Sequence, residues 1–234
     1  MRRLLLTMLL FSFLPLVSPD ASAAGIQIGR TRIIYLANKK EVALPVINKE
    51  SEMPWLVQSW VDNGDGKTRA PFIITPPLFR LDPLKEQSLR IIRSGGNMAQ
   101  DRESLFYANV RTIPALAKDT QDKNVLRLIY KTRLKLFYRP VGLSGTPDDA
   151  CSHLQFTRTG ATLQVNNRSA YYTVFDSLSL GSTPIPKADM LAPFTQISLP
   201  LPEKTSASKD IAWRCISDYG NATEKFSTHL DTGS

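Results

Sequence analysis

The chain has 234 residues, a formal net charge of +8, two cysteines and two histidines. His153 and His229 are too isolated for a histidine metal site, and neither lies in an HExxH or HxxxH pattern. The chain also lacks the G-x-S-x-G, G-x-G-x-x-G and P-loop motifs of hydrolases and nucleotide-binding enzymes. We therefore expect no catalytic residue, no metal and no cofactor. The basic charge favours acidic partners without identifying them.

The first segment, residues 1–23, has the pattern of a secretory signal peptide. Two arginines precede an apolar run from Leu4 to Val17, and the small residues Ala21-Ser22-Ala23 follow it. We expect cleavage before Ala24. No other stretch approaches the roughly 18 apolar residues of a membrane-spanning helix, so the sequence predicts a soluble, exported product.

Residues 24–140 predict a first β-sandwich. Apolar segments alternate with clusters of Gly, Pro, Asn and Asp, the residues that turns require. Seven strands in about 115 residues favour an immunoglobulin-like sandwich. We expect these strands near residues 26–35, 42–48, 55–62, 72–75, 87–92, 104–112 and 125–138.

The last of these strands has the strongest pattern, and we extend it from Val125 to Arg139. Successive side chains of a strand point to opposite faces, so one face is apolar and the other basic. About fifteen residues is long for a strand. Two interpretations stay open: an ordinary amphipathic sandwich strand, or an edge that serves as a template for another chain. The apolar positions include Leu126, Leu128, Tyr130, Leu134 and Leu136; the basic positions are Arg127, Lys131, Arg133, Lys135 and Arg139.

Basic and aromatic side chains on one strand also suit nucleic acid. The export signal argues against nucleic acid as a partner, so we expect no nucleic-acid binding.

The boundary of the first domain follows this strand, because Pro140 cannot continue a strand ladder.

Residues 141–234 predict a second immunoglobulin-like β-sandwich, with no helix of ten residues. The segment Val141–Pro147 has loop composition, and Asp148 and Asp149 are expected to be solvated loop charges. Short apolar runs follow, which indicate strands. These runs are 154–156, 162–165, 171–175, 178–180, 195–199, 211–216 and 225–230.

Both cysteines, Cys151 and Cys215, lie in this second domain. An exported chain with an even number of cysteines favours a disulfide. The bond would close a loop of about 65 residues and stabilise the domain by roughly 4 kcal/mol in the chain-entropy model.

The segment Met98–Ala115, MAQDRESLFYANVRTIPA, closely resembles the signature of the periplasmic pilus chaperones of chaperone–usher assembly. The resemblance covers both domains in the same order. It continues at Gly29–Arg32, at Ile74–Pro77 with Arg80-Leu81, at Lys131–Pro140 (KTRLKLFYRP) and at Ser217–Gly220.

This resemblance implies an all-β fold of two immunoglobulin-like domains set in an L, with a cleft between them. It implies a non-enzymatic chaperone of the periplasm. Such a chaperone binds pilin or fimbrial subunits by donor-strand complementation and delivers them to an outer-membrane usher. Two other classes stay open: an exported immunoglobulin-like adhesin or receptor, and a secreted enzyme with an unrecognised site.

The resemblance also assigns roles to individual residues. A subunit's C-terminal carboxylate is expected at two cations, its groove receives three apolar side chains, and an ionic cluster joins the domains. Thr75-Pro76 matches a position where the family has a cis peptide bond. We further expect the free chain to cover its apolar strand, as in a self-capping dimer. The carboxylate-binding residues are Arg32 and Lys135, the groove-binding residues Leu126, Leu128 and Tyr130, and the cluster residues Glu103, Arg139 and Asp218.

Overall fold

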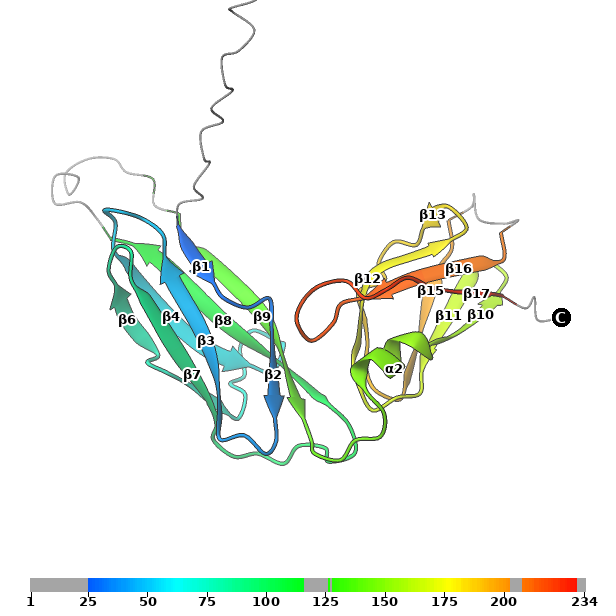
Figure 1. The fold of residues 1–234 in the computed structure, drawn as a ribbon, viewed down its shortest axis with the longest axis horizontal. Helices are drawn as coiled ribbons and strands as arrows, with labels where there is room; N and C mark the ends of the chain where they lie inside the picture. Colours follow the sequence, from blue (N-terminus) through cyan, green and yellow to red (C-terminus); the bar gives the residue numbers. More distant parts are fainter. Residues whose placement is uncertain (1–24, 116–125, 127, 203–207, 231–234) are drawn as a thin grey trace, which may run out of the picture.

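The computed structural model describes residues 25–115, 126, 128–202 and 208–230; the predicted signal peptide, residues 1–23, lies outside them. The described chain forms two β-sandwiches that meet at an angle (Figure 1). This confirms the predicted fold class. No helix in these ranges is long and apolar enough to cross a membrane.

The N-terminal sandwich consists of two facing sheets. One sheet has the strand order β1-β3-β7-β5 and the other β2-β9-β8-β4-β6. The strands are β1 (Ile26–Ile28), β2 (Arg32–Leu36), β3 (Glu41–Asn48), β4 (Trp55–Asp62), β5 (Phe72–Thr75), β6 (Leu78–Leu81), β7 (Glu86–Arg93), β8 (Ser104–Pro114) and β9 (Tyr130–Arg139).

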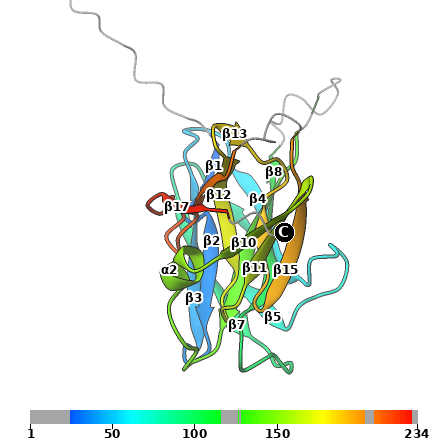
Figure 2. The ribbon, with the colours of Figure 1, turned by 90° about the vertical axis from the view of Figure 1, so that its right-hand side faces the viewer.

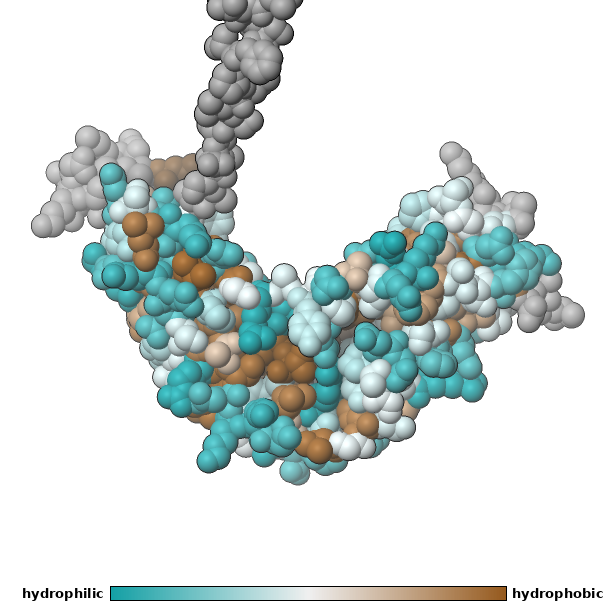
Figure 3. All heavy atoms as spheres, in the orientation of Figure 1, coloured by the Kyte–Doolittle hydropathy of each residue, from teal (hydrophilic) through white to brown (hydrophobic). Residues whose placement is uncertain are grey.

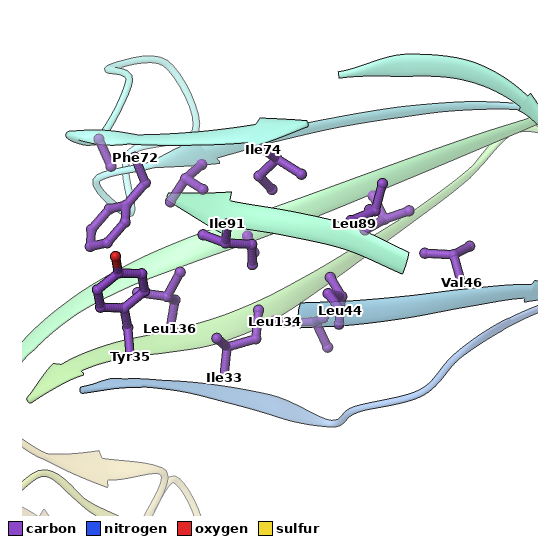
Figure 4. Close-up of a cluster of buried hydrophobic side chains, with 14 of the residues drawn as sticks. Ile33, Tyr35, Leu44, Val46, Phe72, Ile74, Leu89, Ile91, Leu134 and Leu136 are labelled. Atoms are coloured by element: carbon purple, nitrogen blue, oxygen red, sulfur yellow. The ribbon is translucent and has the colours of Figure 1, made fainter. Parts of the chain in front are cut away.

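The core of this domain lies between the two sheets. Alternate residues of each strand point inward, and Figure 4 shows side chains of β2 and β9 meeting those of β3, β5 and β7. Ile33, Leu44, Leu89, Ile91 and Leu136 are fully buried. Burial of one such side chain stabilises the folded state by roughly 1.5–3 kcal/mol. The apolar positions that alternate in the sequence therefore determine which face of each strand points into the core.

The expected strand 26–35 is wrong in one respect: it is two strands, which belong to different sheets. β1 pairs antiparallel with β3, and β2 pairs parallel with β9. Between them the backbone N–H of Gly29 donates to the carbonyl of Pro45, and a Cβ at Gly29 would lie only 3.1 Å from the Pro45 ring. The chain thus crosses from one sheet edge to the other at a residue without a side chain.

A second difference is β6, which the sequence analysis missed. Its four residues lie between Pro76-Pro77 and Asp82-Pro83. Because turn-forming residues flank it so closely, the sequence predicts a loop where this short strand lies. The Thr75-Pro76 peptide bond is cis.

The strand expected from Val125 begins only at Tyr130. Val125 and Arg127 lie outside the described residues, whereas Leu126 and Leu128 are described and have no strand conformation. The ladder with β8 starts at the pair Thr112 and Tyr130, and a strand is defined by its ladder rather than by its alternation.

The C-terminal sandwich has a three-stranded sheet, β10-β11-β15, and a five-stranded sheet, β13-β12-β16-β17 with β14 paired to β12. Figure 2 views the molecule with this domain in front. The expected runs 171–175 and 178–180 belong to one strand, interrupted by an irregularity between Phe175 and Ser177. The strands are β10 (Gln155–Thr159), β11 (Thr162–Asn167), β12 (Thr173–Leu180), β13 (Thr183–Pro184), β14 (Met190–Leu191), β15 (Thr195–Pro200), β16 (Asp210–Cys215) and β17 (Phe226–His229).

Asp148 and Asp149 are not loop charges, because they lie in the first turn of the short helix α2 (Pro147–Ser152). Thr146 is its N-cap. The Thr146 hydroxyl accepts from the N–H of Asp149, and the Asp149 carboxylate accepts from the N–H of Thr146. Thr followed by Pro at the first helical position and an acid at the third is a start signal that the sequence analysis overlooked.

The predicted disulfide between Cys151 and Cys215 is confirmed, with Cα atoms 6.2 Å apart. It joins α2 to β16 beside the core of the C-terminal domain. The buried Trp213 Nε1 donates to the carbonyl of Cys151 at 2.9 Å, so a side-chain hydrogen bond supports the same junction.

Candidate functional site

Arg32 and Lys135 occupy paired positions on the parallel strands β2 and β9. Neighbouring strands lie about 4.8 Å apart, so the two cationic side chains start side by side. Arg32 Nη1 donates to the carbonyl of Ile216 in the C-terminal domain at 2.9 Å. Its Nε is buried and has no hydrogen-bond partner within the described part of the chain. Burial lowers the pKa of Arg32, and the charge of Asp218 opposes this shift.

Lys135 also reaches the C-terminal domain. Its Nζ lies 2.9 Å from Oδ1 of Asp189, in the segment that leads into β14. The Lys135 side chain is 24% exposed and that of Asp189 is 75% exposed. Both cations therefore lie where the domains meet, and both suit charge-assisted hydrogen bonds to a carboxylate. Asp189 has no sequence signal, because its contact with Lys135 exists only when the domains are folded together.

Glu103, Arg139 and Asp218 are brought together at the same junction. Arg139 Nε donates to Glu103 Oε1 at 2.6 Å, and both terminal nitrogens of Arg139 donate to the Asp218 carboxylate, at 2.6 and 2.8 Å. The N–H of Tyr172 donates to Glu103 Oε2 at 2.8 Å. One arginine on β9 thus bridges an acid of its own domain and an acid of the other.

Burial raises the pKa of Glu103, and the guanidinium of Arg139 and the N–H of Tyr172 oppose this shift. Burial would lower the pKa of Arg139, but Asp218 and Glu103 together raise it. Arg139 consequently stays positively charged within the cluster. A buried network of this kind contributes more to geometry than to stability, because desolvation offsets much of the attraction.

Apolar and backbone contacts complete the junction. The rings of Phe137 and Tyr172 lie 5.5 Å apart, and the N–H of Glu103 donates to the carbonyl of Ala170. Gly220 has a φ of 92°, and a Cβ there would overlap the hydroxyl of Thr31. Glycine therefore permits both the left-handed turn and the close approach of the two domains.

Leu126, Leu128 and Tyr130 are 84%, 54% and 55% exposed, unlike the later apolar residues of β9, such as Leu134 and Leu136, which are in the core. The ring of Tyr130 lies 6.3 Å from that of Trp55 and is tilted against it, and this contact leaves the tyrosine exposed. The apolar face predicted from the sequence is thus divided between core and surface.

The edge of β9 next to these residues is unpaired. β8 covers one edge from Tyr130 to Tyr138, but β2 covers the other only from Lys135 to Arg139. From Tyr130 to Leu134 this second edge has no strand partner within the described ranges. Exposed apolar side chains beside free backbone donors and acceptors form a surface that can accept an additional strand.

The surface view shows an open angle between the two domains (Figure 3). Hydrophobic surface is visible on the N-terminal domain and towards the junction, whereas hydrophilic residues cover most of the remainder in this view. The arrangement offers three features that can bind a partner: the cations Arg32 and Lys135, the exposed apolar row, and the open edge of β9. Within the described residues no group of three or more His, Cys, Asp or Glu side chains is placed to hold a metal ion.

Comparison with protein families gives two matches that follow one another along the chain. Residues 25–144 match the family described as pili and flagellar-assembly chaperone, PapD N-terminal domain. Residues 149–227 match the pili assembly chaperone PapD, C-terminal domain.

Individual proteins give the same result. The chain is 38% identical over 219 residues to the chaperone protein LpfB of Salmonella typhimurium, covering 93% of this chain and 94% of LpfB. It is 38% identical over 214 residues to the chaperone protein FimC of Escherichia coli K12, covering 91% and 88%. A similar solved structure is the Salmonella enterica SafA pilin in complex with the SafB chaperone, with a TM-score of 0.80, 34% identity and coverage of 89% and 98%. The E. coli chaperone DraB has a TM-score of 0.77, 36% identity and coverage of 89% and 97%.

Proposed function

This chain belongs to the family of pilus assembly chaperones of the chaperone–usher pathway, which are not enzymes, and we propose that it binds fimbrial subunits in the periplasm by donor-strand complementation. It then delivers them to an outer-membrane usher. Support for the compartment comes from the signal-peptide pattern of residues 1–23 and from the Cys151–Cys215 disulfide. The similar SafB chaperone was solved in complex with a pilin.

The observation that carries this proposal is the continuity of the exposed apolar row with the open edge of β9. Leu126, Leu128 and Tyr130 are more than half exposed, and the unpaired edge begins where they end. Isolated exposed apolar residues are common, but a row beside a free strand edge invites aggregation unless it serves a partner. A subunit that lacks a strand would receive the backbone pairing from this edge and fill its groove with these side chains.

Arg32 and Lys135 would fix the register of that pairing by holding the subunit's C-terminal carboxylate. A one-residue slip turns every side chain of a strand to the opposite face. Lys135 lies five residues beyond Tyr130 on β9, so the anchor and this groove residue share one strand. Leu126 and Leu128 precede that strand directly. The cluster of Glu103, Arg139 and Asp218 would hold the two domains at the angle that the subunit requires.

The decisive experiment compares Lys135→Ala and Leu128→Glu with wild type in the capture of a purified subunit encoded in the same gene cluster. We expect folded, exported proteins that no longer capture the subunit. Lys135→Ala lacks one of the two cations that would hold the subunit's carboxylate. Leu128→Glu would bury an unpaired charge in the subunit's groove. Lys209→Ala, which removes an exposed lysine of the C-terminal domain, is the control and should behave as wild type.

Failure of wild type to bind any such subunit would reject the proposed function. Normal capture by Lys135→Ala and Arg32→Ala, together with normal capture of subunits without a C-terminal carboxylate, would reject the anchor alone. If Leu128→Glu binds the subunit as well as wild type does, the proposal that the apolar row fills the subunit's groove is wrong.

We also propose that the free chain covers its apolar row with a second copy in a self-capping dimer. The same exposed side chains support this, since soluble monomers rarely leave such a row uncovered. Light scattering at increasing protein concentration should show a dimer that Leu128→Glu abolishes. A monomer at every concentration would contradict this proposal.

A further inference from the structure

The outer face of the sheet β2-β9-β8-β4-β6 carries an aromatic residue between two cations. The guanidinium carbon of Arg111 and the Nζ of Lys131 each lie 5.2 Å from the centre of the Trp60 ring. Arg111 and Lys131 are paired positions on β8 and β9. Cation–π contacts hold both charges over the ring instead of leaving them free to rotate. The positions of the charges are therefore set before any partner arrives.

No carboxylate among the described residues pairs with the charges of Arg111 and Lys131. The neighbouring Arg133 is different, because it pairs with the buried Asp62 at 2.8 Å. Arg111 reaches only the uncharged Gln58, at 3.4 Å. Neither Arg111 nor Lys131 forms an ion pair with any residue that the structure describes.

The surface beside Trp60 is hollowed, and it adds further positive charge. Lys67, Arg69 and Arg111 line this hollow together with Trp60 and Gln58. Within the described ranges, Lys67 and Arg69 have no carboxylate partner either. The basic face formed by Trp60, Lys67, Arg69, Arg111 and Lys131 therefore has an aromatic centre and four cations, none of which forms an ion pair with a described residue.

We propose that this basic face docks an acidic stretch of the fimbrial subunit; this rests on the proposed function and specifies the chemistry of the subunit. Lys131 and Lys135 lie on the same face of β9, four residues or about 13 Å apart. A subunit anchored at Lys135 and extended along β9 reaches the basic face first at Lys131. Uncompensated positive charge attracts acidic surfaces from a distance and accelerates association with them.

The test removes two of these charges and leaves Trp60 in place. Arg111→Gln/Lys131→Gln is compared with Lys39→Gln/Lys40→Gln, which removes the same net charge from two exposed residues before β3. The probe is the purified subunit encoded in the same gene cluster, and stopped-flow association is measured at several salt concentrations. We expect the first variant to associate about three- to tenfold more slowly at low salt, with a weaker salt dependence and an unchanged dissociation rate. The control should retain the rate and the salt dependence of wild type.

Equal rates and equal salt dependence for the two double variants would overturn the inference, whether both match wild type or both are slowed. So would a change confined to the dissociation rate at every salt concentration. In each of these outcomes wild type still captures the subunit, so the proposed function stands. Absence of capture by wild type would instead reject the proposed function.

Discussion

Lys135 Nζ lies 2.9 Å from Asp189 Oδ1, so a carboxylate of the C-terminal domain already occupies one of the two candidate anchor cations. The Asp189 side chain is 75% exposed, and exposed pairs of this kind contribute under about 1 kcal/mol. To bind Lys135, a subunit carboxylate would have to displace the weakly bound carboxylate of Asp189. We therefore expect Asp189 to compete with a subunit carboxylate for Lys135.

Asp189→Asn should bind a fimbrial subunit about two- to fivefold more tightly than wild type, because removal of the competing charge frees Lys135. Titration of labelled subunit measures the change. Asp176→Asn removes an exposed acid from the same domain and should leave the affinity unaltered. Equal affinities for all three proteins would show that Asp189 does not compete.

Leu126→Ala and Leu128→Ala should leave the free energy of unfolding within about 0.5 kcal/mol of wild type, since both side chains are exposed. Each should weaken subunit binding by roughly 1.5–3 kcal/mol, the value of burying one such side chain. Val141→Ala, at a residue that is 66% exposed, is the matched control. A loss of stability without a loss of affinity would place these leucines in the core instead.

Asp62 predicts acid sensitivity of the N-terminal domain. Burial would raise its pKa, but hydrogen bonds from the N–H of Gly64, from Asn109 and from Arg133 lower it. A depressed folded pKa stabilises the protein above the unfolded value of about 3.9, and this contribution is lost as pH falls through the folded value.

Asp62→Asn should therefore lower the free energy of unfolding by about 1–3 kcal/mol at pH 7 and by less at pH 3. Guanidinium denaturation of wild type and variant at both pH values measures this difference. A difference that does not change with pH would mean that the charge of Asp62 contributes nothing to stability.

Cys151→Ala/Cys215→Ala should lower the stability of the C-terminal domain by roughly 4 kcal/mol, since it removes a crosslink over 64 residues. Subunit affinity should change less, because both cysteines belong to the core of the C-terminal domain, whereas the proposed anchor and groove residues belong to the N-terminal domain. Calorimetry and subunit titration below the unfolding temperature separate the two effects. A parallel loss of both would show that the domains are energetically coupled.

Arg139→Ala should change the angle between the domains, because Glu103 and Asp218 would then face each other without their shared cation. Breaking a buried pair in this way typically costs about 3–5 kcal/mol. Small-angle scattering should report a wider distribution of shapes. An unchanged scattering profile would assign domain orientation to the contacts of Phe137 with Tyr172 and of Thr31 with Gly220.

The fold class, the pairing of the cysteines and the two faces of β9 could all be predicted before the structure was known. These follow from local rules: alternation assigns a strand's faces, and cysteine number in an exported chain favours a disulfide. The resemblance to the pilus chaperones also supplied the candidate site residues, including Arg32 and Lys135, which alternation alone could not distinguish from ordinary surface cations.

The folded chain was needed to establish where β9 begins, which sheet receives Arg32, and what each cation contacts. Strand limits depend on partners: β8 pairs back only to Tyr130, and alternation continues past that point without a ladder. Asp189 and Lys135 are 54 residues apart and lie in different domains, so no local pattern relates them. Contacts between domains depend on the angle at which the two cores meet, and no periodicity of the chain encodes that angle. The bonds of Arg139 to Glu103 and Asp218 cross this junction and became visible only in the folded chain.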